Sequence, residues 1–142
     1  MNDLYSLYPK LHIDVEHEQA LLMEADFVVF QHPFYWYSGP ALLKEWIDVV
    51  LEQGFAYGPS GNALRGKAWL HSVTTGMHGN TYTPDGLNQA TMAELLRPFE
   101  VTARFCGMRW LEPLVFHGSN EADSSCIGRH AQTLRGLLEE RC

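Results

Sequence analysis

The sequence lacks the features that mark several large classes of protein. It has 142 residues with only 10 lysines and arginines against 17 aspartates and glutamates, which gives a formal net charge of −7. A chain so poor in positive charge is a weak candidate for binding nucleic acid through its phosphates. No apolar run is long enough to span a bilayer, and the first residues do not have the form of a signal peptide.

Cysteine is scarce, and other signatures of metal or hydrolase chemistry are absent. Cys106, Cys126 and Cys142 are an odd number of thiols without the spacing of metal ligands, which argues against a secreted disulfide scaffold and favours a reducing cytoplasm. The seven histidines form no i, i+4 pair on an expected helix, so we predict no metal site. No GxSxG elbow occurs, which disfavours a serine hydrolase.

What the sequence does contain is an alternation of strand-like and helix-like segments. Strands are expected at 25–30, 67–75 and within 108–118, and segment 3–9 is a further candidate. Helices are expected at 15–24 after Asp14, from near Pro40, from about 88 to 106 with a break at Pro98, and at 124–141. This alternation predicts a single α/β domain over 1–142, with a parallel sheet covered by helices on both faces.

The helix that starts near Pro40 has the clearest amphipathic pattern. Pro40 suits the first helical position, which places Ser38 or Gly39 near the cap. One stripe of this helix is apolar and is expected to face the core, and it consists of Leu42, Leu43, Trp46, Ile47, Val50 and Leu51.

Two unusual loops follow strands and should therefore meet at one edge of the sheet. The segment QHPFYWYSGP (31–40) carries four consecutive aromatic residues, and residues 75–86 are polar and glycine-rich. In parallel α/β sheets, ligands bind beyond the carboxyl ends of the strands. The placement of both loops predicts a ligand site there.

A flat redox ring would explain the aromatic loop. Aromatic side chains contact an isoalloxazine, and backbone N–H groups bond its nitrogens and carbonyls. Trp36 and Tyr37 are our choices for these contacts; the alternative is that Phe34 and Trp36 fill the core. The TTG motif at 74–76 offers hydroxyls and a close backbone approach, although it is also compatible with an ordinary turn.

Four segments together carry a family resemblance. HPFYWYSGPALLKEWIDVVLEQGFAYG, GKAWLHSVTTG, LLRPFEVTARFCGM and FCGMRWLEP resemble the NAD(P)H:quinone oxidoreductase family of flavodoxin-like proteins, especially ancillary proteins of bacterial glutathione-regulated potassium-efflux systems. The likeness runs from about Asp3 to the last helix. It implies a flavodoxin-like three-layer sandwich with bound FMN, or alternatively FAD, and hydride transfer from NAD(P)H to a quinone. It also implies a homodimer.

The resemblance assigns the residues of the flavin site. It places one set of residues on each side of the ring: Pro33, Phe34, Tyr35, Trp36 and Tyr37 on one, and Thr74, Thr75, Gly76 and Met77 on the other.

Tyr82 matches a tyrosine that faces the hydride-transfer site in the mammalian enzymes, so it is the expected catalytic residue. Those enzymes carry a proton-relaying histidine a few residues later, where this chain has Asn88, which cannot relay a proton as imidazole does. His78 is nearby in sequence and is expected to be a loop histidine. His32 is expected to be a surface or hinge histidine without a catalytic role.

The N-terminal part departs from the family pattern. The resemblance aligns segment 3–9 with the second strand, so we expect the chain to be incomplete at its N-terminus, without the first strand, the phosphate loop and the first helix. The alternative is that segment 3–9 pairs directly with the strand at 25–30. Flavin affinity is expected to be low because the anchor of the cofactor phosphate is missing.

Three functions stay open at this point. The first is a quinone reductase. The second is a regulatory subunit that docks on a cation/proton antiporter, peripherally on the cytoplasmic face of the inner membrane. The third is a non-catalytic remnant without flavin.

Overall fold

The computed structural model of the chain describes residues 2–139. Its helices and strands alternate over most of that length. In chain order the elements are α1 (Leu4–Leu7), α2 (Val15–Glu24), β1 (Phe27–Pro33), α3 (Ala41–Val50), β2 (Ala68–Thr74), η1 (Gly79–Thr81), α4 (Met92–Phe105), β3 (Arg109–Trp110), β4 (Leu114–Phe116), η2 (Ser119–Glu121) and α5 (Ser124–Glu139).

The sheet is entirely parallel and has β2 at its centre. β1 pairs with β2 along its whole length, from Phe27 opposite Ala68 to Pro33 opposite Thr74. On the other side, β2 pairs first with β3 and then with β4. The third expected strand is therefore two short strands, because Pro113 has no N–H to donate to the ladder and the chain leaves the sheet over residues 111–113.

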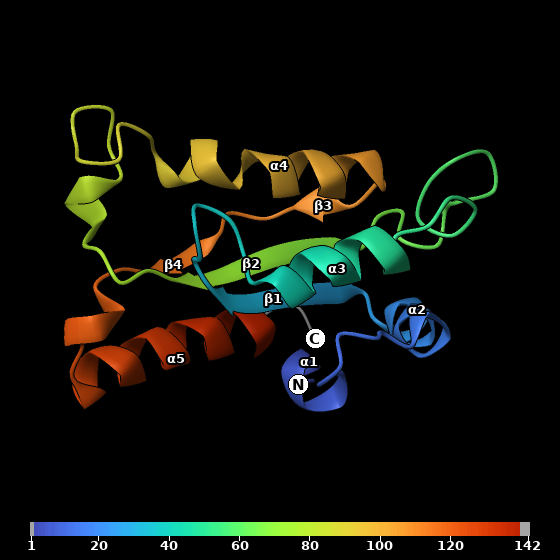
Figure 1. Cartoon of the computed structure of the whole chain (residues 1–142), viewed down its shortest axis with the longest axis horizontal. Helices are drawn as coiled ribbons and strands as arrows, with labels where there is room; N and C mark the ends of the chain where they lie inside the picture. Colours follow the sequence, from blue (N-terminus) through green and yellow to red (C-terminus); the bar gives the residue numbers. More distant parts are fainter. Residues whose placement is uncertain (1, 140–142) are drawn as a thin grey trace.

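Helices cover both faces of this sheet, as expected for a three-layer α/β fold. Figure 1 shows α4 along one side of the strands and α5 along the other. Successive strand residues point to opposite faces, so Phe30 and His32 of β1 are buried while Gln31 between them is exposed. Phe30 packs edge-on against Trp46 of α3, at 5.2 Å between ring centroids. The core thus lies mainly between the sheet and the layer of α3 and α4.

α3 buries its expected apolar stripe and so fixes the segment that follows the aromatic loop. Its stripe is almost completely inaccessible: Leu42, Leu43, Trp46, Ile47 and Val50 are all buried. Pro40 is the N-cap and Ala41 is the first helical residue. We predicted the cap at Ser38 or Gly39, which is one or two residues too early. Pro40 itself takes the N-cap position, with an extended backbone (φ −57°, ψ 151°).

The N-terminal segment was predicted as a strand, and this prediction was wrong. Residues 4–7 form the short helix α1, because the Asp3 carboxylate accepts hydrogen bonds from the N–H groups of Tyr5 and Ser6. The alternative in which segment 3–9 pairs directly with β1 is wrong for the same reason. Within residues 2–139, no strand pairs with the edge of β1 that faces away from β2.

α2 begins after Asp14, as predicted, and it is anchored by a buried carboxyl group. The Asp14 side chain accepts a hydrogen bond from the N–H of His17. Glu18 is only 5% exposed. Its two oxygens accept hydrogen bonds from the Tyr8 hydroxyl at 2.6 Å and from the Trp46 indole N–H at 2.8 Å. These bonds tie α2 to the segment after α1 and to α3.

α4 runs without interruption through Pro98, where a break was predicted. A capping box starts it: the Thr91 hydroxyl accepts from the N–H of Glu94, and the Glu94 carboxylate accepts from the N–H of Thr91. Leu96, Phe99 and Ala103 are buried and hold the helix on the sheet. This packing outweighs the one backbone hydrogen bond that the proline lacks.

None of the helices in the described part of the chain combines the length and the apolar character that crossing a membrane requires.

Candidate functional site

The aromatic loop and the loop after β2 meet at the carboxyl edge of the sheet, as the sequence predicted. β1 and β2 end side by side at Pro33 and Thr74. The two chains stay joined just beyond the strands, because the N–H of Phe34 donates to the Thr74 carbonyl at 2.8 Å. Any ligand that lies on one loop is therefore within reach of the other.

The aromatic residues of the first loop divide between core and surface. Phe34 is half-buried against the core, as the core-filling alternative proposed for it. Trp36 is 92% exposed and Tyr35 is 59% exposed, so that alternative is wrong for Trp36. Water-facing aromatic rings on an ordered loop offer a flat apolar surface to a ligand.

The backbone of this loop is held in an unusual shape. Trp36 and Tyr37 have φ angles of 48° and 61°, which are left-handed values that cost energy in residues other than glycine. The hydrogen bond from the N–H of Ser38 to the Tyr35 carbonyl, at 3.0 Å, closes the turn around them. The turn leaves both side chains exposed.

Several backbone donors in the two loops have no protein acceptor in the described part of the chain, and four of them belong to residues that the resemblance places around the flavin ring. Within residues 2–139, no hydrogen bond uses the N–H groups of Trp36, Tyr37, Gly76 or Met77. A flavin ring has carbonyl oxygens and ring nitrogens along one edge, so it needs donors of this kind together with an apolar face. The donors and the aromatic faces therefore fit the flat part of a flavin.

Thr75 is the best-connected residue of the second loop. It is 1% exposed, its N–H donates to the Phe116 carbonyl at 2.9 Å, and its hydroxyl donates to the Met77 carbonyl at 2.8 Å. The same hydroxyl oxygen lies 2.9 Å from Nδ1 of His117. Thr75 therefore supports the turn from within and presents no free group of its own to a ligand.

Tyr82 lies next to this threonine and is 9% exposed. Its ring packs against Phe34 at 6.0 Å and against His117 at 5.3 Å between centroids. The largest effect on the pKa of the Tyr82 phenol is burial, which raises it. The Thr75 side chain, as a hydrogen-bonding neighbour, lowers this pKa, and the nearby Tyr37 raises it. Tyr82 consequently carries its proton at neutral pH.

Asn88 connects the two loops through side chains. The Tyr37 hydroxyl donates to Asn88 Oδ1 at 3.1 Å, and Asn88 Nδ2 donates to the Thr81 hydroxyl at 3.2 Å. The residue that replaces the expected histidine thus has a structural role, since it holds the aromatic loop against the segment before Tyr82.

Two histidines, His78 and His117, lie near each other in this region, and His117 packs against Tyr82. His78 is an exposed loop residue, as predicted, and its Nε2 lies 3.2 Å from a Glu121 carboxylate oxygen. His117 is half-buried; burial first, and then His78, lower its pKa from the ordinary value of 6.5. A Cβ on Gly79 would lie 3.2 Å from Cδ2 of His117, so the glycine lets the backbone approach this ring closely.

His32 was predicted to be a surface or hinge histidine, and this prediction was wrong. The side chain is 7% exposed, and its Nε2 lies 2.8 Å from Nδ1 of His71, which is fully buried. Nδ1 of His32 lies 3.0 Å from the Pro33 carbonyl, which can only accept, so His32 carries its proton there. His71 must then donate from Nδ1, which leaves its Nε2 without a partner.

The histidine pair lies directly behind the aromatic loop. Rings of Phe30, Phe99 and Trp110 surround His71 at 4.4–5.5 Å between centroids. Burial first, and then the neighbouring His32, lower the pKa of His71 to about 2. Both imidazoles are therefore neutral at physiological pH, and the pair fastens the carbonyl of Pro33 to the core.

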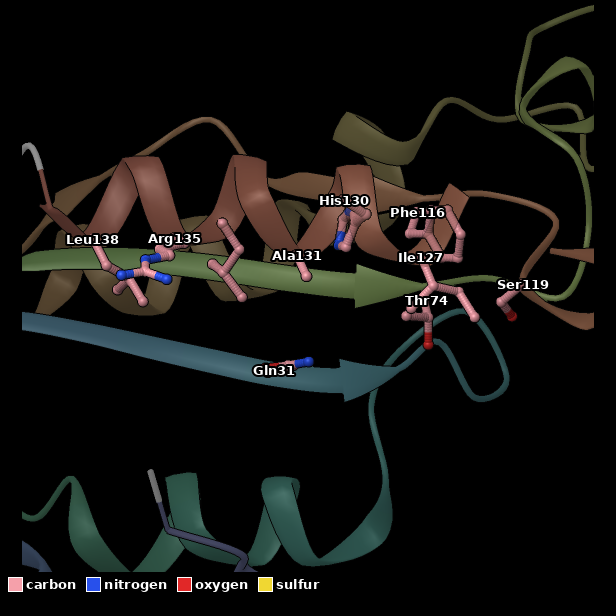
Figure 2. A pocket seen from close by; sticks show the side chains of 10 residues that line it. Gln31, Thr74, Phe116, Ser119, Ile127, His130, Ala131, Arg135 and Leu138 are labelled. Carbon is pink, nitrogen blue, oxygen red and sulfur yellow. The ribbon is translucent and has the colours of Figure 1, made fainter. Parts of the chain in front are cut away.

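Two cavities adjoin the site. One of about 890 Å³ extends along β1 and reaches His32, Pro33 and Thr74. The other, of about 480 Å³, lies between the sheet and α5. Figure 2 shows Gln31 and Thr74 on the strand side of the smaller cavity and Ile127, Ala131 and Leu138 on the helix side. Both cavities end at the Thr74 edge of the sheet.

In the described part of the chain, no group of three or more histidine, cysteine, aspartate or glutamate side chains is arranged to hold a metal ion.

Comparisons with known proteins agree with this architecture. Residues 1–138 match the model of the family described as having a flavodoxin-like fold. The glutathione-regulated potassium-efflux system ancillary protein KefG of Pectobacterium carotovorum is 49% identical over 132 residues, which are 93% of this chain and 72% of the relative.

Two solved structures show the same arrangement. General stress protein 14 of Treponema denticola, in complex with FMN, has a TM-score of 0.91 and 41% identity over 96% of this chain and 78% of that one. An NADPH-quinone reductase from P. pentosaceus has a TM-score of 0.80 and 38% identity over 84% of this chain and 71% of that one. With its parallel sheet between two helical layers, the chain belongs to the family of proteins with a flavodoxin-like fold.

Proposed function

We propose that the protein is a flavin-dependent NAD(P)H:quinone oxidoreductase. One observation carries the proposal: two loops joined by the bond from Phe34 to Thr74 combine exposed aromatic faces with backbone donors that have no protein acceptor among the described residues, including those of four residues expected at the ring. This combination suits a flat ring that carries acceptors along one edge. The FMN complex and the quinone reductase among the similar structures support the same chemistry.

Each loop has its own part in holding the cofactor, which we propose to be FMN rather than FAD. Trp36 and Tyr37 supply apolar contacts and N–H donors on one side. Gly76 and Met77 supply N–H donors on the other, within a turn that Thr75 holds rigid. Pro33, Phe34, Tyr35 and Thr74 complete the wall. When bound, flavin supplies two-electron transfer from a nicotinamide to a quinone.

Tyr82 is the proposed acid at the acceptor. Since burial raises the pKa of its phenol, it keeps a proton to donate to a quinone oxygen as hydride arrives. One shared place for nicotinamide and quinone makes ping-pong kinetics the expected pattern.

The direct test is titration of the purified protein with FMN, followed by assay of NAD(P)H-dependent quinone reduction. Trp36→Ala should weaken FMN binding by about 10-fold or more, since it removes the most exposed ring at little cost to folding. Phe105→Ala is the matched control, because this residue is also exposed but belongs to the end of α4. Equal FMN affinity in both variants would refute the site.

A second function is favoured by the named relatives. Because a protein 49% identical is a potassium-efflux ancillary protein, we also propose that the chain docks on a cation/proton antiporter, peripherally at the cytoplasmic face of the inner membrane, as a homodimer. Co-purification with the antiporter tests the docking, and light scattering tests the dimer. If the Trp36→Ala variant failed to bind FMN but still docked on the antiporter, the result would favour a regulatory role that needs no flavin.

A further inference from the structure

Tyr82 has no obvious source of a replacement proton in the proposed reaction. Reduction of a quinone to a hydroquinone takes one hydride and one proton, and the enclosed phenol must recover each proton that it gives. Asn88, in its loop, cannot supply one, because a neutral amide does not exchange protons as imidazole does. The inference below rests on the proposed function and concerns this proton.

The hydroxyl of Thr75 lies beside His117 and acts on Tyr82. Its oxygen is 2.9 Å from Nδ1 of His117, whose ring packs against that of Tyr82 at 5.3 Å between centroids. As a hydrogen-bonding neighbour, the Thr75 side chain lowers the pKa of the Tyr82 phenol. The hydroxyl hydrogen of Thr75 is directed to the Met77 carbonyl, which can only accept. His117 must therefore donate from Nδ1, and in its neutral form its Nε2 carries no hydrogen.

The imidazole is held in place but keeps one nitrogen free. Its ring packs against Tyr82 on one side and against the backbone of Gly79 on another. Within residues 2–139, no hydrogen bond uses its Nε2, and the side chain is only half-buried. Nε2 is therefore free to take a proton from water.

We propose that His117 resupplies the proton of Tyr82 through the hydroxyl of Thr75. Nε2 takes a proton from water, and the cationic ring passes its Nδ1 proton to the Thr75 oxygen. The Thr75 hydrogen turns from the Met77 carbonyl to the phenolate of Tyr82. One proton enters at Nε2 and one leaves at the quinone oxygen, while NAD(P)H is the source of the hydride, so charge and atoms balance.

The neighbouring groups suit this role. The titratable side chains around the ring are Tyr82 and His78, with Glu121 beyond His78 and Tyr37 beyond Tyr82. Since burial and His78 lower the pKa of His117, its cationic form releases a proton more readily than an exposed histidine does. His78 itself has no bond to Thr75 or Tyr82 among the described residues and has no part in the relay.

The first test needs no flavin. Long-range ¹H–¹⁵N spectra of histidine-labelled protein should show His117 protonated at Nδ1 at pH 8. Thr75→Val should abolish that preference, and Thr75→Ser should keep it. A His117 ring protonated at Nε2 in the unaltered protein would overturn the relay.

The second test separates the two half-reactions in the FMN-loaded protein. His117→Asn should slow quinone reduction by about 10²-fold and remove its decline with rising pH, while flavin reduction by NAD(P)H keeps its rate. His17→Asn, on the exposed face of α2, should change neither. Equal slowing of both half-reactions would overturn the relay. If the unaltered protein reduced no quinone, the proposed function would be overturned, and the relay with it. The histidine spectra would still show whether His117 donates to Thr75.

Discussion

The buried pair of His32 and His71 should make the stability of the protein depend on pH. His71 has a pKa of about 2 in the folded chain and an ordinary value of 6.5 when unfolded. Because the folded pKa is the lower one, the unfolded chain takes up the proton first as the pH falls. The free energy of unfolding is therefore highest above pH 6.5 and decreases below it.

The size of the effect follows from the two pKa values. Between pH 8 and pH 5 the folded ring stays neutral while the unfolded ring becomes almost fully charged, so His71 alone should lower the free energy of unfolding by about 2 kcal/mol. The structural reason is that a proton on Nε2 would place an unpaired donor and a charge among aromatic rings.

Urea unfolding of the unaltered protein and of His71→Asn at both pH values measures the effect. Asparagine keeps a donor near the Nε2 of His32 and does not titrate. The variant should be less stable at pH 8, because the smaller side chain leaves a cavity. Its loss of stability between pH 8 and pH 5 should, however, be smaller than that of the unaltered protein by about 2 kcal/mol. His17→Asn is the control, since this exposed ring should leave the difference unchanged. An identical pH difference in all three proteins would refute the assignment of a neutral buried ring.

Three further predictions concern the scaffold. Thr91→Ala should lower the free energy of unfolding by about 1 kcal/mol through loss of the capping box, and Thr91→Ser should restore it. Glu18→Leu should cost about 2–5 kcal/mol by denaturant unfolding, because the Tyr8 hydroxyl and the Trp46 indole would be buried without an acceptor; a cost below 1 kcal/mol would contradict these bonds. The Cys106 thiol, which is buried and has a pKa raised by burial, should stay unmodified by a thiol reagent in native protein and react on unfolding, as peptide mapping would show.

The features that the sequence predicted well are those with a local cause. The stripe of α3 follows from helical spacing, and the meeting of the two loops follows from the shared edge of parallel strands. Local signals were misjudged in two places. The Asp3 cap turns segment 4–7 into a helix, and the packing of Phe99 carries α4 through Pro98.

The histidines show what sequence reasoning missed. His32 and His71 are 39 positions apart, and Thr75 and His117 are 42 apart. The first pairing depends on the register of β1 on β2, and the second depends on the register of β2 on β4, whose ends Thr75 and His117 follow. The sequence did contain one indication. His71 lies in a buried strand on the same face as Trp69 and Val73, where an imidazole has to be neutral or hydrogen-bonded.

The most direct test of the account is a backbone amide NMR titration of the protein with FMN. The account predicts that the N–H signals of Trp36, Tyr37, Gly76 and Met77 shift together and more strongly than others, because these donors have no protein acceptor within residues 2–139 and belong to the residues proposed to lie around the ring. It would be contradicted if FMN bound while these four signals stayed in place, or if none of the assigned signals moved at saturating FMN.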